Sequence, residues 1–230
     1  MKKGDLKKQE IIRTAEALFC RKGYEATGVQ DILDELHASK GSFYHHFVSK
    51  EALLEAILSG RAAQALEAVL AEETEETPIA RLNRLLCGLI PLKQDQLSFL
   101  MMLLPVFARP EGRSVKNAYC DALLRAFLPS VSEAVAAAAQ AGDLPARDSG
   151  LQAEICLALI NRLWVKICEM MIEKAKTGSE TDPADLLHLA DGYRTAVENV
   201  LTAPFGSLPV IRLADLKLLS DQILIHWKES

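Results

Sequence analysis

Apolar residues recur at helical spacing along almost the whole chain. Near the N-terminus, Ile11, Ala15, Leu18 and Phe19 follow at intervals of four, three and one residues, which places them on one face of a helix. The segment 152–176 repeats this spacing. No alternating β pattern, internal repeat or low-complexity tract stands out. The sequence therefore predicts an all-α fold of about ten helices.

Capping residues mark where the N-terminal helices begin and end. Gly23 can close the first helix, and Thr27 and Ser39 can cap a short second and a short third helix. Ser49 can open a long fourth helix, and Pro78 stands at the favoured first-turn position of a further one. Three short, closely spaced elements therefore precede a long one.

The rest of the chain predicts a larger helical domain. Its expected helical segments are the apolar stretch 97–108, then 114–141, 152–176 and 183–201, and a last helix that runs to Trp227. We expect residues 1–50 to form a small domain and residues 51–230 a helical bundle. The fourth helix, from about residue 49, would link the two.

Charge is unevenly divided between these two parts. The chain carries a net charge of −5, but residues 1–50 hold nine Lys/Arg and seven Asp/Glu. A mildly basic N-terminal part permits contact with phosphates, and an acidic remainder discourages non-specific binding to nucleic acid. No secretory leader is recognisable, and the longest mainly apolar stretch is well short of the ~20 residues that span a bilayer. Five cysteines without close pairing indicate a reducing cytoplasm.

Residues 27–50 have the spacing of a helix-turn-helix. Two short helices flank the three-residue turn Leu36-His37-Ala38. On the second helix, Phe43 and Phe47 share the face directed at the first helix of the chain. The opposite face carries small, polar and ionisable side chains. Geometry alone leaves DNA binding and ordinary core packing about equally supported.

The motifs themselves point to a family. The stripe Ile11-Ile12…Ala15…Leu18-Phe19 is followed by GYEATGVQDI and by SKGSFYHHFVSKEAL. With these motifs, roughly the first 60 residues resemble the tetracycline-repressor (TetR) family of transcriptional regulators. The resemblance implies a three-helix DNA-binding domain joined to a ligand-binding and dimerisation domain. It also implies a homodimer on double-stranded DNA with a palindromic operator, released by a small ligand. Few polar groups occur around Phe99, Met102 and Trp164, so we expect this ligand to be mainly apolar.

The resemblance also assigns roles to individual residues. Thr27 would cap the second helix against a phosphate, and Lys50 would hold another phosphate. The recognition helix would begin at Ser39, Lys40, Gly41 and Ser42, and Tyr44, His45 and His46 would reach bases or backbone. The chain departs from the usual Ala-Gly-Val turn, because His37 occupies the middle position, where φ > 0 is expected.

The larger domain offers candidates for the effector pocket and the dimer contact. The pocket candidates are Phe99, Met102, Phe107, Phe127, Trp164 and Met171. By resemblance, the dimer would form through the helices at 152–176 and 183–201. Apolar residues at helical spacing also suit ordinary core packing, and the methionines suit either role.

Other functions stay open beside the regulator. An architectural DNA-binding protein of the same fold, with no metabolite ligand, is the main alternative. A helical enzyme is disfavoured, because no Walker loop, G-x-G-x-x-G, H-E-x-x-H or G-x-S-x-G motif occurs. We expect no catalytic residue, cofactor or metal site. Thiol sensing by the cysteines is a further possibility, beside their burial as small apolar residues.

Overall fold

The computed structural model describes residues 3–72, 76–90, 94–107, 112–177, 183–209 and 211. These ranges contain helices and no strand, which confirms the all-α prediction. The helices are α1 (Lys3–Lys22), α2 (Val29–Glu35), α3 (Lys40–His46), α4 (Lys50–Leu70), α5 (Pro78–Cys87), α6 (Gln94–Phe107), α7 (Arg113–Gln140), α8 (Ser149–Thr177) and α9 (Pro183–Leu201). The helix predicted to end at Trp227 lies outside the described residues.

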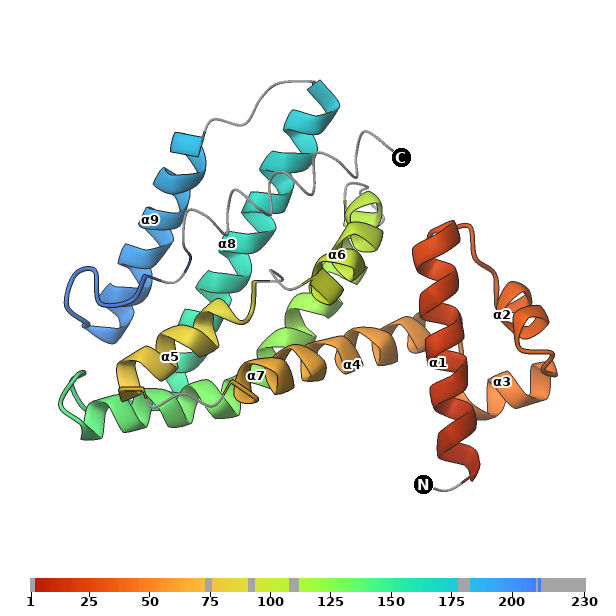
Figure 1. Cartoon of the computed structure of the whole chain (residues 1–230), viewed down its shortest axis with the longest axis horizontal. Helices are drawn as coiled ribbons and strands as arrows, with labels where there is room; N and C mark the ends of the chain where they lie inside the picture. The colour runs from red at the N-terminus through yellow and green to blue at the C-terminus, as the bar shows by residue number, and fades with distance from the viewer. Residues whose placement is uncertain are drawn as a thin grey trace.

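The helices form two lobes that α4 connects. Helices α1, α2 and α3 make a small lobe, and α5 to α9 make a larger one (Figure 1). Helix α4 has 21 residues, hence a length of about 30 Å, and it runs from behind α1 into the larger lobe (Figure 1). Helix α6 lies on the side of the larger lobe nearest α1 (Figure 1). A rigid element is therefore shared by both lobes.

Several predicted helix starts are confirmed by hydrogen bonds. Ser39 Oγ accepts from the backbone N–H of Ser42 at 3.3 Å, and Ser49 Oγ accepts from that of Ala52 at 3.1 Å. Pro78 occupies the first turn of α5. Each cap satisfies a donor that the helix itself leaves free, so the sequence defines these boundaries locally.

Helix α7 is the central helix of the larger lobe. It packs against α4, α5 and α8. By length and composition alone, α7 could cross a membrane, as could many core helices of soluble proteins. Its buried side chains include Leu123, Phe127, Val131 and Val135. Contact with three other helices accounts for its apolar composition.

Helices α8 and α9 pack side by side and are joined by polar contacts at one end. Gln152 Nε2 donates to the carbonyl oxygen of Val200 at 2.9 Å. Glu198, which is 2% exposed, forms an ion pair with Arg194 and accepts the backbone N–H of Leu208 at 3.1 Å. The segment after α9 is therefore anchored to that helix.

Two glycines provide a test of this packing. Gly60 lies in α4 with open space where a side chain would project, so Gly60→Ala should raise the free energy of unfolding by about 0.5–1 kcal/mol. Gly88 ends α5, and a methyl group there would overlap the side chain of Val69 and lie 3.3 Å from Phe127. Gly88→Ala should therefore lower the free energy of unfolding by about 1–3 kcal/mol. Urea unfolding measures both, and equal effects would contradict the described packing.

Candidate functional site

The small lobe packs around apolar side chains of α1 and α3, which belong to a core cluster that extends into the larger lobe. The predicted stripe of α1 is buried, with Ile11, Ala15, Leu18 and Phe19 each at most 1% exposed. Phe43 of α3 belongs to the same buried cluster and is 0% exposed. Burial of these side chains determines which face of α3 turns outward.

The connection between α2 and α3 is the tight turn expected of a helix-turn-helix. His37 has a φ of 46°, which confirms the positive φ expected at the middle position. The backbone N–H of Ala38 donates to the carbonyl oxygen of Leu33 at 2.9 Å. An ion pair between Arg21 and Glu35, at 3.2 Å, joins the ends of α1 and α2. The turn is thus formed without a glycine.

The prediction that Thr27 caps α2 is wrong. Thr27 is 0% exposed, and its hydroxyl donates to the carbonyl oxygen of Gly23 at 2.8 Å. The N-cap is Gly28, whose backbone N–H donates to the Asp31 carboxylate at 2.7 Å. Hydrogen bonds from Lys22 and from Gly28 lower the pKa of Asp31. Thr27 therefore supports the end of α1 from inside and offers no side chain to a phosphate.

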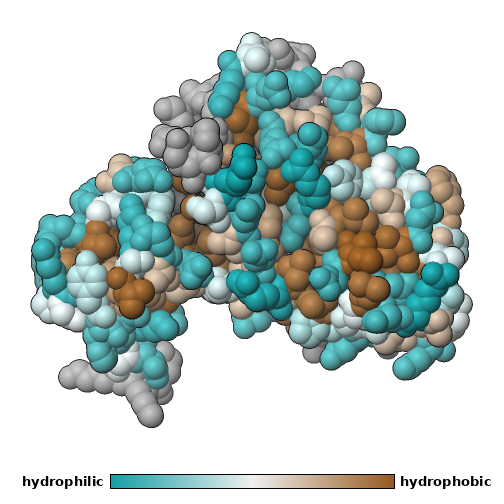
Figure 2. All heavy atoms as spheres, turned by 180° about the vertical axis from the view of Figure 1, so that it is seen from behind, coloured by the Kyte–Doolittle hydropathy of each residue, from teal (hydrophilic) through white to brown (hydrophobic). Residues whose placement is uncertain are grey.

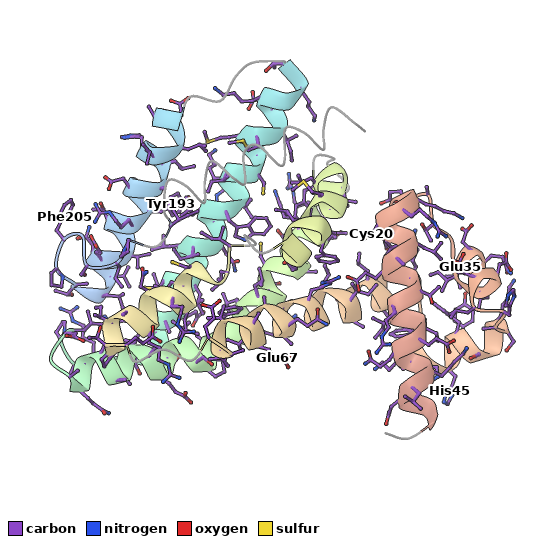
Figure 3. All side chains as sticks on the ribbon, viewed as in Figure 1. Cys20, Glu35, His45, Glu67, Tyr193 and Phe205 are labelled. Carbon is purple, nitrogen blue, oxygen red and sulfur yellow. The ribbon has the colours of Figure 1, made fainter. Side chains whose placement is uncertain are left out.

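The outer face of α3 presents most of the side chains predicted to contact DNA. The exposed residues are Ser39, Lys40, Gly41, Tyr44 and His45, and the half-buried ones are Ser42 and His46. Tyr44 is 54% exposed, although its ring meets that of the buried Phe43 edge-on. His45 lies at the outer edge of the small lobe (Figure 3). These side chains are thus mounted on a firmly packed helix.

Lys50 lies at the start of α4 and has internal partners. Its ammonium donates to the carbonyl oxygens of Tyr24 and Thr27 at 3.1 and 3.2 Å. It also lies 4.2 Å from the centroid of the Tyr24 ring. The cation therefore ties α4 to the segment between α1 and α2. The phosphate contact predicted for Lys50 must compete with these bonds.

Three of the predicted effector residues meet in the larger lobe. Trp164 lies 6.2 Å from Phe107, measured between ring centroids. Tyr119, which the sequence analysis did not single out, lies 5.9 Å from both Trp164 and Phe99. We call these four residues of α6, α7 and α8 the aromatic cluster. Its rings touch one another, so a ligand there must separate them.

The other effector candidates are not all placed in this cluster. Phe127 is buried beside Gly88 and Val69, in the packing of α4, α5 and α7. Met171 is buried on α8, and the Met102 side chain lies outside the described residues. Phe127 is therefore better explained as a core residue.

Polar residues missed by the sequence analysis surround the aromatic cluster. Asn161 accepts from Trp164 Nε1 at 3.3 Å and donates to the carbonyl oxygen of Cys120 at 3.0 Å. An asparagine inside the apolar helix 152–176 was a signal that could have been used. Arg61 of α4 lies 5.1 Å from the Phe99 ring and forms an ion pair with Glu16 of α1. No local sequence pattern links Arg61 to Phe99 or to Glu16.

The five cysteines are free thiols that differ in burial. Cys156 and Cys168 are buried, and burial raises the pKa of the Cys156 thiol to about 12. Cys20 is exposed on α1 where that helix approaches α6 (Figure 3). Within the described ranges, no three His, Cys, Asp or Glu side chains gather as a metal site would require. Burial favours the small-apolar-residue interpretation for Cys156 and Cys168.

Relatives in sequence match half of the chain or less. The chain is 32% identical over 114 residues to an uncharacterized HTH-type transcriptional regulator of Bacillus subtilis, YerO, covering 48% of this chain and 39% of that protein. It is 53% identical over 53 residues to YuxN of the same species, covering 23% and 18%. It is 43% identical over 51 residues to the HTH-type transcriptional repressor KstR2 of Mycobacterium tuberculosis, covering 22% and 26%. The matched region thus spans less than half of each relative.

Solved structures extend the likeness in fold to most of the chain. A TetR-family transcriptional regulator from Pectobacterium atrosepticum superposes with a TM-score of 0.59 at 18% identity, covering 89% of this chain and all of that one. A regulator from Rhodococcus sp. gives 0.55 at 20% identity, covering 85% and 98%. At such identities the likeness concerns the fold.

The sequence model of the family described as "Bacterial regulatory proteins, tetR family" matches residues 11–57. This range includes α2, the turn at His37 and α3, and it ends within α4. The motif thus coincides with the helix-turn-helix geometry, and the fold beyond it agrees with that of the solved relatives. Residues 11–57 therefore resemble the tetR family of bacterial regulatory proteins in sequence, and most of the chain resembles solved TetR-family regulators in fold.

Proposed function

We propose that this protein is a transcriptional regulator that inserts α3 into the major groove of double-stranded DNA. The observation that carries the proposal is the two-sided character of α3. Phe43 anchors the helix in the core, and Lys40, Tyr44 and His45 project from its exposed side. Phosphate contacts from the lysine would set the register, and the ring side chains would reach base edges.

Gly41 supports close approach of DNA to α3. A methyl group at this position would meet only Ser39 Oγ, at 3.9 Å, so the packing of the protein does not require glycine. The residue is exposed, and its lack of a side chain leaves the backbone open on the proposed DNA face. Close contact with a bound DNA duplex would explain a glycine at position 41, which the packing of the protein does not explain.

We infer that regulation is by repression and that it requires a homodimer. KstR2, to which the chain is 43% identical over 51 residues, is named as a repressor. On α8, Leu151 and Ile155 are 55% and 40% exposed, and Ala158 and Arg162 continue the same helix face. Figure 2 shows apolar surface on the larger lobe, away from the small lobe. Two small lobes on a two-fold axis would read half-sites roughly 34 Å apart, or a near multiple of that.

Release from DNA by an apolar effector is proposed to act through Arg61. This side chain contacts Phe99 of the aromatic cluster and is paired with Glu16 of α1. A ligand that separates the rings would move Phe99, and Arg61 would pass this displacement to α1 and α4. To reverse operator occupancy almost completely, the ligand must prefer the released state by about 10⁴-fold.

The closed aromatic cluster also favours a second candidate function. If nothing separates these rings, the protein is an architectural DNA-binding protein of the same fold without a metabolite ligand. Thermal unfolding in the presence of a panel of apolar compounds distinguishes the two, because a ligand of the folded state raises the unfolding temperature. A hit that leaves DNA affinity unchanged would favour the architectural function.

Lys40 and Lys50 should differ in their effects on DNA binding and on stability. Lys40→Ala should flatten the dependence of log K on log salt by about 0.9, one phosphate's share, without changing stability. Lys50→Met should lower the free energy of unfolding by about 1–2 kcal/mol, because it removes two charged hydrogen bonds. Arg81→Ala, which removes a charge from the exposed side of α5, is the control. Fluorescence anisotropy with a duplex selected from a random library measures the slopes, and equal slopes for Lys40→Ala and Arg81→Ala would refute the docking.

A charge on the exposed face of α8 should disrupt the dimer. Ile155→Asp would place a carboxylate in the proposed interface, so the protein should sediment as a monomer at micromolar concentration. Leu70→Asp is a matched control, because Leu70 of α4 is 42% exposed, close to the 40% of Ile155. Sedimentation velocity measures both variants. A wild-type protein that is itself monomeric would end the dimer proposal.

The contact of Arg61 with Glu16 should carry the coupling between the lobes. Both side chains are about four-fifths buried, at 24% and 18% exposure, so a double-mutant cycle with Arg61→Met and Glu16→Gln should give a coupling of about 0.5–1.5 kcal/mol in urea unfolding. Phe99→Ala, which removes one ring of the cluster, should change the affinity for the selected duplex. That change should shrink in the Arg61→Met background. An equal change in both backgrounds would mean that another contact links the lobes.

A further inference from the structure

A continuous groove runs between α4 and α7 at the junction of the two lobes. It consists of two adjoining cavities of about 350 and 450 Å³ that share Glu55, Ser114 and Ala118. We call it the α4–α7 groove. Each volume falls within the range of about 300–1,000 Å³ typical of small-molecule sites. None of the four residues of the aromatic cluster lines it, so it is a separate site.

The floor of the groove is apolar. Leu54 and Leu58 of α4 contribute to one wall, and Val115 and Ala118 of α7 to the other. The leucines are 4% and 1% exposed and are therefore part of the core, whereas Val115 and Ala118 are half-buried. Such a floor favours a ligand with an apolar body over a simple hydrated ion.

The rim of the groove is mainly acidic at the end beside Tyr24 and Leu54, whereas Asp121 and Arg125 line the other end. Glu25, Glu51 and Glu55 line the acidic part of the rim and are exposed. Among the described residues, neither Glu25 nor Glu55 has an ion-pair partner, and the ammonium of Lys50 is held by two carbonyl oxygens. Burial, and then the charges of Glu51 and Glu25, raise the pKa of Tyr24 to about 12. The carboxylates thus act on the groove wall itself.

We propose that the α4–α7 groove binds an amphiphilic organic cation. Its apolar part would lie on Leu54, Leu58 and Val115, and its charge would face the carboxylates of Glu25 and Glu55. Charge complementarity selects this occupant, because an anion or a nucleic-acid phosphate would meet unpaired carboxylates and a neutral apolar compound would gain nothing from them.

The groove is placed to affect the orientation of the lobes. Tyr24 and Glu25 belong to the small lobe, whereas Ser114, Val115 and Ala118 belong to the larger one. A molecule between these walls fixes the distance between them. The cation would therefore bind one relative orientation of the lobes better than others, which makes the groove a regulatory site.

Tetraphenylphosphonium and tetraphenylborate provide a matched pair of probes, since they have the same shape and opposite charges. Isothermal titration of the full chain should show binding of the phosphonium and much weaker binding of the borate. Glu55→Gln should weaken phosphonium binding about fivefold, and Glu25→Gln with Glu55→Gln about twentyfold. Ala118→Trp, which fills the groove, should abolish it while the circular dichroism of the helices is retained.

Glu67→Gln is the matched control, because Glu67 is an exposed carboxylate on the C-terminal half of α4, outside the groove (Figure 3). It should leave phosphonium binding unchanged. Equal weakening by Glu55→Gln and Glu67→Gln, equal binding of the two probes, or no binding at millimolar concentration would each overturn the proposal. Binding that Phe107→Ala removes and Ala118→Trp does not would place the cation in the aromatic cluster, overturning the groove and leaving the effector proposal intact.

Discussion

The orientation of α3 depends on one packing constraint, the burial of Phe43 and Phe47 in the core formed with α1. Both rings are nearly inaccessible, at 0% and 4% exposure, so α3 cannot rotate without exposing an aromatic side chain. Loss of such burial costs about 3–5 kcal/mol for a phenylalanine cut to alanine. The outward direction of Tyr44 and His45 therefore follows from the apolar face, and α1 controls what α3 presents.

Charged contacts join the small lobe to the rest of the molecule alongside an apolar core that is continuous from α1 and α3 through α4 into the larger lobe. Lys50 is held by two backbone carbonyl oxygens and Arg61 by Glu16 and the Phe99 ring. Partly buried ion pairs contribute little net stability but are specific in geometry. These charged contacts depend more strongly on geometry than the apolar packing around them, so a displacement of the lobes by a few ångströms would rearrange them first.

The sequence was sufficient for features that local chemistry determines. Helix starts at Ser39 and Ser49 and the turn at His37 were predicted because each depends on neighbouring backbone groups. The capping role of Thr27 was predicted wrongly, because Gly28 is the N-cap of α2 and Asp31 completes the cap. Threonine and glycine are about equally common as N-caps, so the sequence did not distinguish Thr27 from Gly28. The pairing of Glu16 with Arg61 spans 45 residues, and the ring contact of Tyr119 with Trp164 a similar distance, so only the tertiary fold could reveal them.

Helix α4 is the element on which both proposed ligands would act. Arg61 connects it to the aromatic cluster, while Leu54, Leu58 and Glu55 of the same helix line the α4–α7 groove. Two ligands that each favour one orientation of a shared rigid helix must affect each other's binding, and by the same factor in both directions. A cation in the groove that favours the released orientation would therefore strengthen effector binding. If it favours the DNA-bound orientation, it would oppose the effector, because α4 cannot adopt both positions at once.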